Sequence, residues 1–157
     1  MNYILEIRKV GYLMKKEFFC DNNLEVSSFS GEGYLPLIDY ESWRVAELRY
    51  CEELEVDKLK DMQKHDESDE VFILLEGDFT LFLGGQGDTI GEIEAVKLEP
   101  LKLYNVKKGT FHTHTPEKNS TVLIVENQNT CDDNSPKVKL TREQKDIIED
   151  LYRQVNA

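Results

Sequence analysis

The segment of residues 64–77 places the strongest constraint on how this chain folds and acts. It begins with a charged stretch that contains His65 and Glu70, continues into the apolar run 71–75, and ends at Gly77. Apolar residues in an unbroken run between polar neighbours indicate a strand that is buried on both faces. A histidine and a carboxylate at the entrance of such a strand stand on a rigid support, which is what a metal site or an acid/base site requires.

Short strands separated by turn signals account for most of the remaining chain. Gly77 and Asp78 predict a turn into a hairpin partner at 79–83, and 121–126 is a second apolar run that we expect to be fully buried. Further strands are expected near 24–29 and over 43–50, 92–98, 101–106 and 111–115, with turns at 30–33 and 107–109, a flexible loop at 84–88, and either a strand or a short helical turn within 52–63.

The C-terminal segment changes from strand to helix periodicity. Thr141 and Gln144 fit a capping box, and apolar residues then recur at helical spacing up to Val155. A chain of 157 residues suits one domain with a real core. We therefore expect an N-terminal extension at 1–13, a β-barrel at 14–140 and a C-terminal helix at 141–157.

Composition excludes several classes of partner. The formal net charge of -12 disfavours nucleic acids and anionic membrane surfaces, because neither polyanion is attracted to such a chain. Glu6, Arg8 and Lys9 interrupt the apolar N-terminus, so it is neither a signal segment nor a membrane span. The three cysteines are odd in number and contain no CxxC pair, which is typical of reduced thiols in a cytoplasmic protein.

The three histidines of the chain gather at two strand entrances. His65 precedes the first apolar run, whereas His112 and His114 precede the second. Residues two apart in an extended strand point to the same face. Even so, we expect His114 to be an exposed or rim residue.

The spacing of these residues resembles the two motifs of the cupin superfamily. His65, Glu70 and Gly77 are similar to the second half of the first cupin motif, and Gly109 with His112 is similar to the second. The two motifs and their hairpins cover about residues 43–127.

Two positions depart from the family pattern. Gln63 stands where the first motif has the leading histidine of its His-x-His pair, and Lys107 stands where the second has a proline. The resemblance implies an all-β, cupin-type double-stranded β-helix (a jelly-roll barrel) with a C-terminal α-helix. It also implies a homodimer.

The resemblance further implies a divalent metal ion, Fe, Mn, Ni or Zn, held by His65, Glu70 and His112, with Gln63 as a weak neutral oxygen donor. Tyr104 lies on the strand before the second motif. It is a candidate catalytic acid if it faces inward, and a core tyrosine with its hydroxyl at the rim if it does not.

Three functions remain open at this point. The first is a metal-binding cupin that acts as a metal-dependent enzyme on a small metabolite. The alternative is a non-catalytic small-ligand-binding cupin with a degenerate metal site. The third, ranked last, is metal-free acid/base catalysis by a histidine and Tyr104.

Overall fold

The computed structural model describes residues 2–9 and 12–157, with side chains from residue 20 onward. The strands are β1 (Asn2–Lys9), β2 (Tyr12–Cys20), β3 (Glu25–Ser30), β4 (Gly33–Tyr40), β5 (Trp43–Arg49), β6 (Asp61–Gln63), β7 (Glu70–Glu76), β8 (Phe79–Gln86), β9 (Glu94–Lys97), β10 (Leu103–Val106), β11 (Thr110–Pro116), β12 (Thr121–Asn127) and β13 (Lys137–Lys139). The helical elements are the short turns η1 (Glu52–Leu54), η2 (Val56–Lys58) and η3 (Asp132–Asn134) and the helix α1 (Arg142–Val155).

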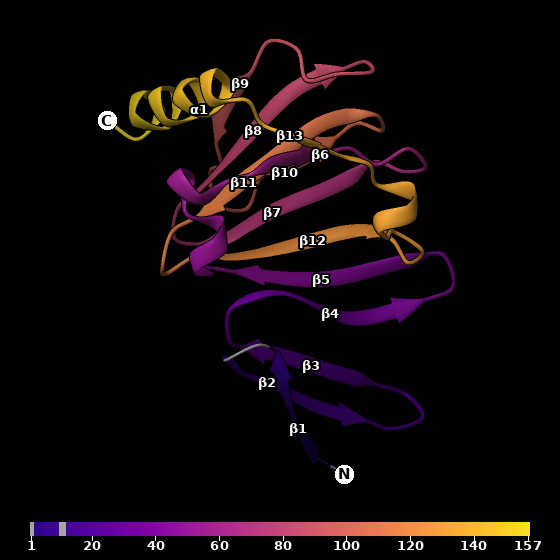
Figure 1. The fold of residues 1–157 in the computed structure, drawn as a ribbon. Coiled ribbons are helices and arrows are strands. Elements are labelled where there is room, and N and C mark those ends of the chain that lie inside the picture. Colours follow the sequence, from indigo (N-terminus) through magenta and orange to yellow (C-terminus); the bar gives the residue numbers. More distant parts are fainter. Residues whose placement is uncertain (1, 10–11) are drawn as a thin grey trace.

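Two five-stranded antiparallel sheets face each other and enclose the interior of a barrel (Figure 1). One sheet has the order β10-β7-β12-β5-β4, and the other has the order β13-β6-β11-β8-β9. From β5 to β12 the chain passes repeatedly between the sheets, which places β5-β12-β7-β10 opposite β6-β11-β8-β9. This is the strand order of an eight-stranded jelly roll. It confirms the expected all-β double-stranded β-helix with a C-terminal helix.

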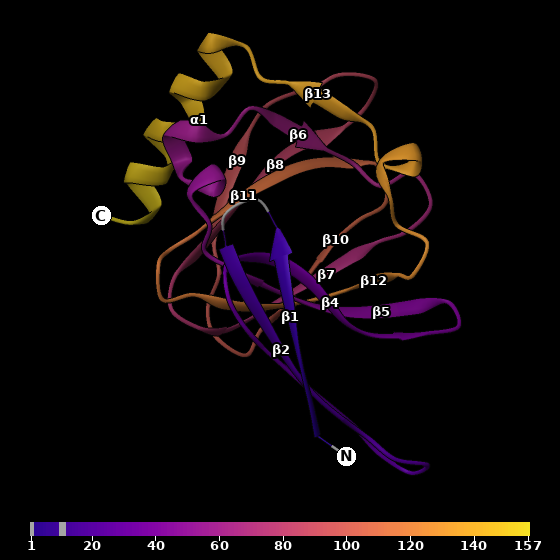
Figure 2. The same ribbon diagram turned by 60° about the horizontal axis from the view of Figure 1, so that its bottom comes forward.

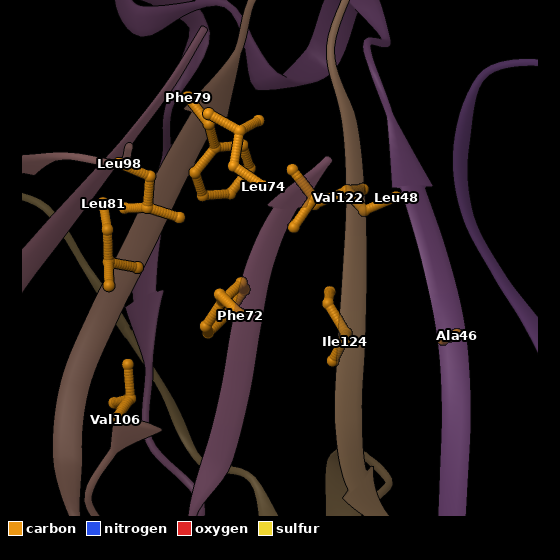
Figure 3. Packing of buried hydrophobic residues seen from close by; sticks show 10 residues of the cluster. All are labelled: Ala46, Leu48, Phe72, Leu74, Phe79, Leu81, Leu98, Val106, Val122 and Ile124. Carbon is orange, nitrogen blue, oxygen red and sulfur yellow. The ribbon is translucent and has the colours of Figure 1, made fainter. Parts of the chain in front are cut away.

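The core fills one part of the space between the sheets (Figure 3). Its buried members come from both sheets and are Ala46, Leu48, Phe72, Leu74, Phe79, Leu81, Leu98, Val106, Val122 and Ile124. The two apolar runs that were expected to be fully buried are buried on this inner face only. Their alternate residues point outward and are partly or largely exposed, because no helix among the described residues covers that sheet.

Helix α1 packs on the outer face of the other sheet, where Ile148 is buried beside Phe82 and Phe111. The capping box is confirmed: the Gln144 backbone N–H donates to Thr141 Oγ1, and the Thr141 N–H donates to Gln144 Oε1. Within the described ranges, no helix has the length and apolar character needed to cross a membrane.

The glycine-rich segment 84–88 differs from the expected loop. Gly84 to Gln86 belong to strand β8. A Cβ on Gly84 would lie 2.9 Å from both Met62 Sδ and Ile90 Cγ2. The glycine therefore allows close packing inside a strand, which periodicity cannot distinguish from a loop.

Strands β1, β2 and β3 form a separate three-stranded antiparallel sheet (Figure 1), and β1 and β2 are seen from a second direction in Figure 2. The backbone of the expected N-terminal extension thus takes part in strand pairing over residues 2–9 and from residue 12. Residues 1, 10 and 11, and side chains up to residue 19, lie outside the described part of the chain. The domain boundaries at 13 and 140 stay predictions.

Candidate metal centre

His65, Glu70 and His112 meet inside the barrel. Glu70 is the first residue of β7, His112 lies on β11 in the opposite sheet, and His65 lies between β6 and β7. Glu70 Oε2 is 3.0 Å from His65 Nε2 and 2.9 Å from His112 Nε2. One potential ligand atom from each residue lies within 4.8 Å of the others, and all three side chains are buried.

Backbone contacts connect the two motifs directly. The Gly109 N–H donates to the His65 carbonyl oxygen at 2.8 Å. Asp69 accepts hydrogen bonds from the Lys108 backbone N–H at 2.8 Å and from the Lys107 ammonium at 3.0 Å. These contacts, with the backbone hydrogen bond from Lys108 first, lower the pKa of Asp69 to about 2. The turn that precedes His112 is therefore fastened to the segment that carries His65.

Two glycines make the required turns. Gly77 has φ +80°, and a Cβ there would lie 2.7 Å from the Asn119 carbonyl oxygen, so the turn after β7 excludes a side chain. Gly109 has φ +78° with open space around it, so conformation alone favours glycine.

The tautomer of His112 follows from its hydrogen bonds. Its Nδ1 lies 2.9 Å from the Thr110 carbonyl oxygen, which can only accept, so Nδ1 carries the proton. In the neutral ring Nε2 then presents a lone pair. Among the residues that the structure describes, Nε2 has no hydrogen-bond partner, although Glu70 Oε2 is 2.9 Å away. A buried acceptor that faces another acceptor calls for a cation between them.

His65 is held in the same tautomer by different means. Its Nδ1 lies 2.8 Å from Ser135 Oγ. Ser135 Oγ donates to Asn134 Oδ1 at 3.2 Å, so it accepts from the His65 ring. Asn134 itself is oriented by its amide hydrogen bonds to Glu67 Oε2 and the Asn129 carbonyl. His65 Nε2 lies 3.0 Å from Glu70 Oε2: it presents a lone pair there when the ring is neutral, and it donates a hydrogen bond to the carboxylate when the ring is protonated.

The pKa shifts of Glu70 and His65 show that the carboxylate and the imidazoles affect each other. Burial by itself raises the pKa of Glu70, but the neighbouring imidazoles of His112 and His65 outweigh it and lower the pKa to about 2. Burial by itself lowers the pKa of His65, but the hydrogen bond and charge of Glu70 raise it above its ordinary value. The carboxylate thus remains ionised, and its counter-charge is either a proton on an imidazole or a metal ion.

The donor set fits a transition metal. Two imidazole nitrogens with Nδ1 engaged and one carboxylate are ligands that Fe, Mn, Ni and Zn accept, and outer hydrogen bonds of this kind orient metal-bound histidines. Gln63 lies opposite His112 in the pairing of β6 with β11, and it lines the same cavity. Gln63 therefore shares a strand face with His112, and its amide stays the predicted fourth donor.

Tyr104, the candidate acid, is not brought to this cluster. Its ring packs against the core, and its hydroxyl oxygen accepts a hydrogen bond from the Glu99 backbone N–H at 2.9 Å. It is absent from the described residues that line the cavity. Its position is that of the core tyrosine considered as the alternative.

His114 is half-buried and lines the cavity, so of the two expected positions, exposed or at the rim, the exposed one is not found. Its ring stacks on Phe79 with centroids 5.2 Å apart and lies 5.7 Å from Phe72, and its Nδ1 is enclosed without a partner among the described residues. Burial lowers the pKa of His114 to about 4, so the ring is neutral. The same-face rule for residues 112 and 114 pointed to this inward position, but the expectation for His114 did not follow it.

A cavity of about 650 Å³ opens beside the cluster. Gln63, His65, Glu70 and His114 form one part of its lining, and Tyr34, Arg44 and Glu126 form another. The segment 130–137 contributes Ser135. Sequence reasoning missed Ser135, Tyr34 and Glu126, because no motif or spacing marks them.

No protein-family model matches the sequence, and no curated protein does. Several solved structures are similar in shape. Pac13 from Streptomyces, a nucleoside dehydratase, has a TM-score of 0.48 and 11% identity, with 89% of this chain and 88% of that chain covered. An RmlC-like cupin family protein from Methanocaldococcus jannaschii has a TM-score of 0.41 and 13% identity, with 70% and 87% covered. A cupin-2 domain containing protein from Shewanella frigidimarina has a TM-score of 0.33 and 17% identity, with 80% of each chain covered.

The strand order itself carries the assignment of the fold. The jelly-roll arrangement of β5 to β12 places both predicted motifs at the ends of inner strands, where His65, Glu70 and His112 converge. The chain therefore has an eight-stranded jelly-roll fold of the double-stranded β-helix type.

Proposed function

We propose that this protein is a metal-binding cupin that holds a divalent transition-metal ion at His65, Glu70 and His112 and takes a small molecule into the adjacent cavity. The supporting observation is that two imidazole Nε2 atoms approach one buried carboxylate oxygen, and that His112 Nε2 has no hydrogen-bond partner among the described residues. When both rings are neutral, the three groups are all acceptors and repel each other in a low-dielectric interior, and a bound cation removes that repulsion.

Each of the proposed ligand residues contributes a different donor to the ion. In this proposal Glu70 supplies the negative charge, the two histidines supply neutral nitrogen donors, and Gln63, which lines the same cavity, adds a neutral oxygen. A bound ion of this kind polarises a coordinated carbonyl or carboxylate, or binds O2. The Thr110 carbonyl and Ser135 hold the rings so that their Nε2 atoms remain available.

A metal-dependent enzyme that acts on a small metabolite is the main form of this proposal. The alternative is a non-catalytic module that binds a small ligand with or without metal, and the fold alone does not choose between them. Metal-free catalysis with Tyr104 as the acid lacks support, because the Tyr104 hydroxyl is engaged by the Glu99 N–H away from the cavity lining.

Metal content tests the proposal directly. We expect plasma mass spectrometry of the purified chain to find close to one Fe, Mn, Ni or Zn per chain, and His65→Ala, purified beside it, to lose most of that metal. Absence of metal from the unmodified chain, even after reconstitution with each ion, would overturn the metal centre and leave the non-catalytic binding module.

A further inference from the structure

A second polar group lies on the cavity wall, on elements other than those of the metal centre. The Tyr34 hydroxyl on β4 donates a hydrogen bond to Glu126 Oε1 on β12. Arg44 Nη1 on β5 lies 3.8 Å from the same oxygen. All three residues line the cavity that His65 and Glu70 also line.

Glu126 keeps one oxygen available to a ligand. Both of its contacts use Oε1, and in the described part of the chain Oε2 has no hydrogen-bond partner. The residue is only 7% exposed, yet it lines the cavity. Oε2 is not among the fully enclosed polar atoms without a partner, so it is open to the cavity and can accept a hydrogen bond from a bound group or water. Glu126 Oε2 is therefore free to accept a hydrogen bond from a ligand.

The surroundings of Tyr34 and Glu126 do not suit an anionic group of a ligand. Arg44 is already engaged by Asp39 through two contacts, Nε to Oδ1 at 2.8 Å and Nη2 to Oδ2 at 3.2 Å. Lys137 is engaged by Asp132 at 2.7 Å. The lining also contains Glu32 and Glu53. A carboxylate or phosphate placed here would meet negative charge, and the described residues of the lining offer no cation that is not already engaged by a carboxylate.

We propose that Tyr34 and Glu126 form a ligand-binding subsite that accepts a hydroxyl or protonated amine on the part of a ligand remote from the metal centre and rejects carboxylate and phosphate groups there. The apolar walls at Leu48 and Ile124 are part of the same cavity. The subsite thus selects a small molecule with a metal-binding end and a donor end. This inference rests on the proposed metal-binding function.

The test uses the full chain loaded with Co²⁺ and a set of hydroxamates, which share one metal-chelating head and differ in their tails. The donor tails are the hydroxamates of β-alanine, γ-aminobutyrate and γ-hydroxybutyrate. The anionic tails are the monohydroxamates of succinate and glutarate, and butyrohydroxamate is the apolar reference. Dissociation constants follow from the visible absorption of Co²⁺.

We expect at least one amine-tailed compound to bind most tightly and the carboxylate-tailed compounds to bind most weakly. Glu126→Gln should weaken the best amine-tailed compound about tenfold, the size of a charge-assisted hydrogen bond, and leave butyrohydroxamate unchanged. Tyr34→Phe should give a smaller loss, because it frees Oε1 rather than removing the acceptor. Glu53→Gln is the matched control, since it removes one cavity-lining charge outside the pair.

Carboxylate tails that bind as tightly as amine tails, or equal losses from Glu126→Gln and Glu53→Gln, would overturn the subsite. Failure of the unmodified chain to take up Co²⁺ would instead overturn the metal centre. In that case the same amine and carboxylate compounds are ranked by their effect on the melting temperature of the metal-free chain. A ranking without an amine preference that depends on Glu126 would then overturn the subsite as well.

Discussion

The two histidines of the candidate metal centre are held in opposite ways. His112 lies on β11, is fully buried, and donates its Nδ1 proton to a backbone carbonyl two residues away on its own strand. His65 lies between strands, and its Nδ1 proton goes to Ser135, seventy residues later in the chain. The sheet thus orients the first ring locally, whereas the fold of a distant segment orients the second.

The difference shows that the site has two halves. The rigid half is His112, which its own strand orients, and the other half is His65, which depends on the segment around Ser135, called the tether below. Asp66 N–H donates to the Asn134 carbonyl, and Lys64 N–H donates to the Pro136 carbonyl, so the Ser135 segment lies along the His65 segment. Each ring keeps one nitrogen for the metal, but loss of the tether should disturb only His65. The following variants separate the two halves.

The largest effect should come from the core that supports the rigid half. Leu74→Ala on β7 or Ile124→Ala on β12 should each lower the free energy of unfolding by roughly 2–5 kcal/mol, because each removes a large side chain that is at most 2% exposed. Chemical denaturation measures this loss. Leu103→Ala, at a site 72% exposed on neighbouring β10, is the control and should change stability by less than about 0.5 kcal/mol. Unchanged stability in both core variants would refute the buried inner face.

Removal of the rigidly held ligand should have the next largest effect. His112→Ala should weaken metal binding by more than about a hundredfold, since even the loss of an outer partner of a metal ligand costs about 10–100-fold. His114→Ala changes a histidine on the same strand face that does not belong to the cluster, so metal affinity should change far less. Competition with a chelating dye measures both affinities, and equal losses would refute the assignment of His112 as the ligand.

Loss of the tether should have the smallest effect of the three. Ser135→Ala should weaken metal binding about 10–100-fold, because His65 loses the acceptor that fixes its tautomer. Ser135→Thr keeps the hydroxyl and should restore affinity. Imidazole nitrogen NMR of the metal-free, isotope-labelled chain should show a mixed tautomer for His65 in Ser135→Ala and an unchanged one for His112. Mixed tautomers for both rings would contradict the separation of the two halves.

Short sequence patterns were enough to predict those features that residues close together in the sequence determine. The apolar runs predicted β7 and β12, the capping box predicted where α1 begins, and the motif spacing predicted the turns at Gly77 and Gly109. These features arise from side-chain alternation, hydrogen bonds a few residues apart and backbone conformation, all of which short spacing encodes. The inward direction of residue 112 follows in the same way.

The sequence by itself therefore determined the main barrel strands, such as β5, β7, β8, β10 and β12, the turns at Gly77 and Gly109, and which residues carry ligand chemistry, but not strands β1, β2, β4 and β13. Only the tertiary structure decided that Ser135 orients His65, that Tyr34 meets Glu126 across ninety-two positions, that His114 Nδ1 is enclosed, and that Tyr104 turns its hydroxyl to Glu99. Each of these depends on which strands become neighbours in the two sheets. Spacing along the chain does not specify that pairing, because it results from the packing of the whole barrel.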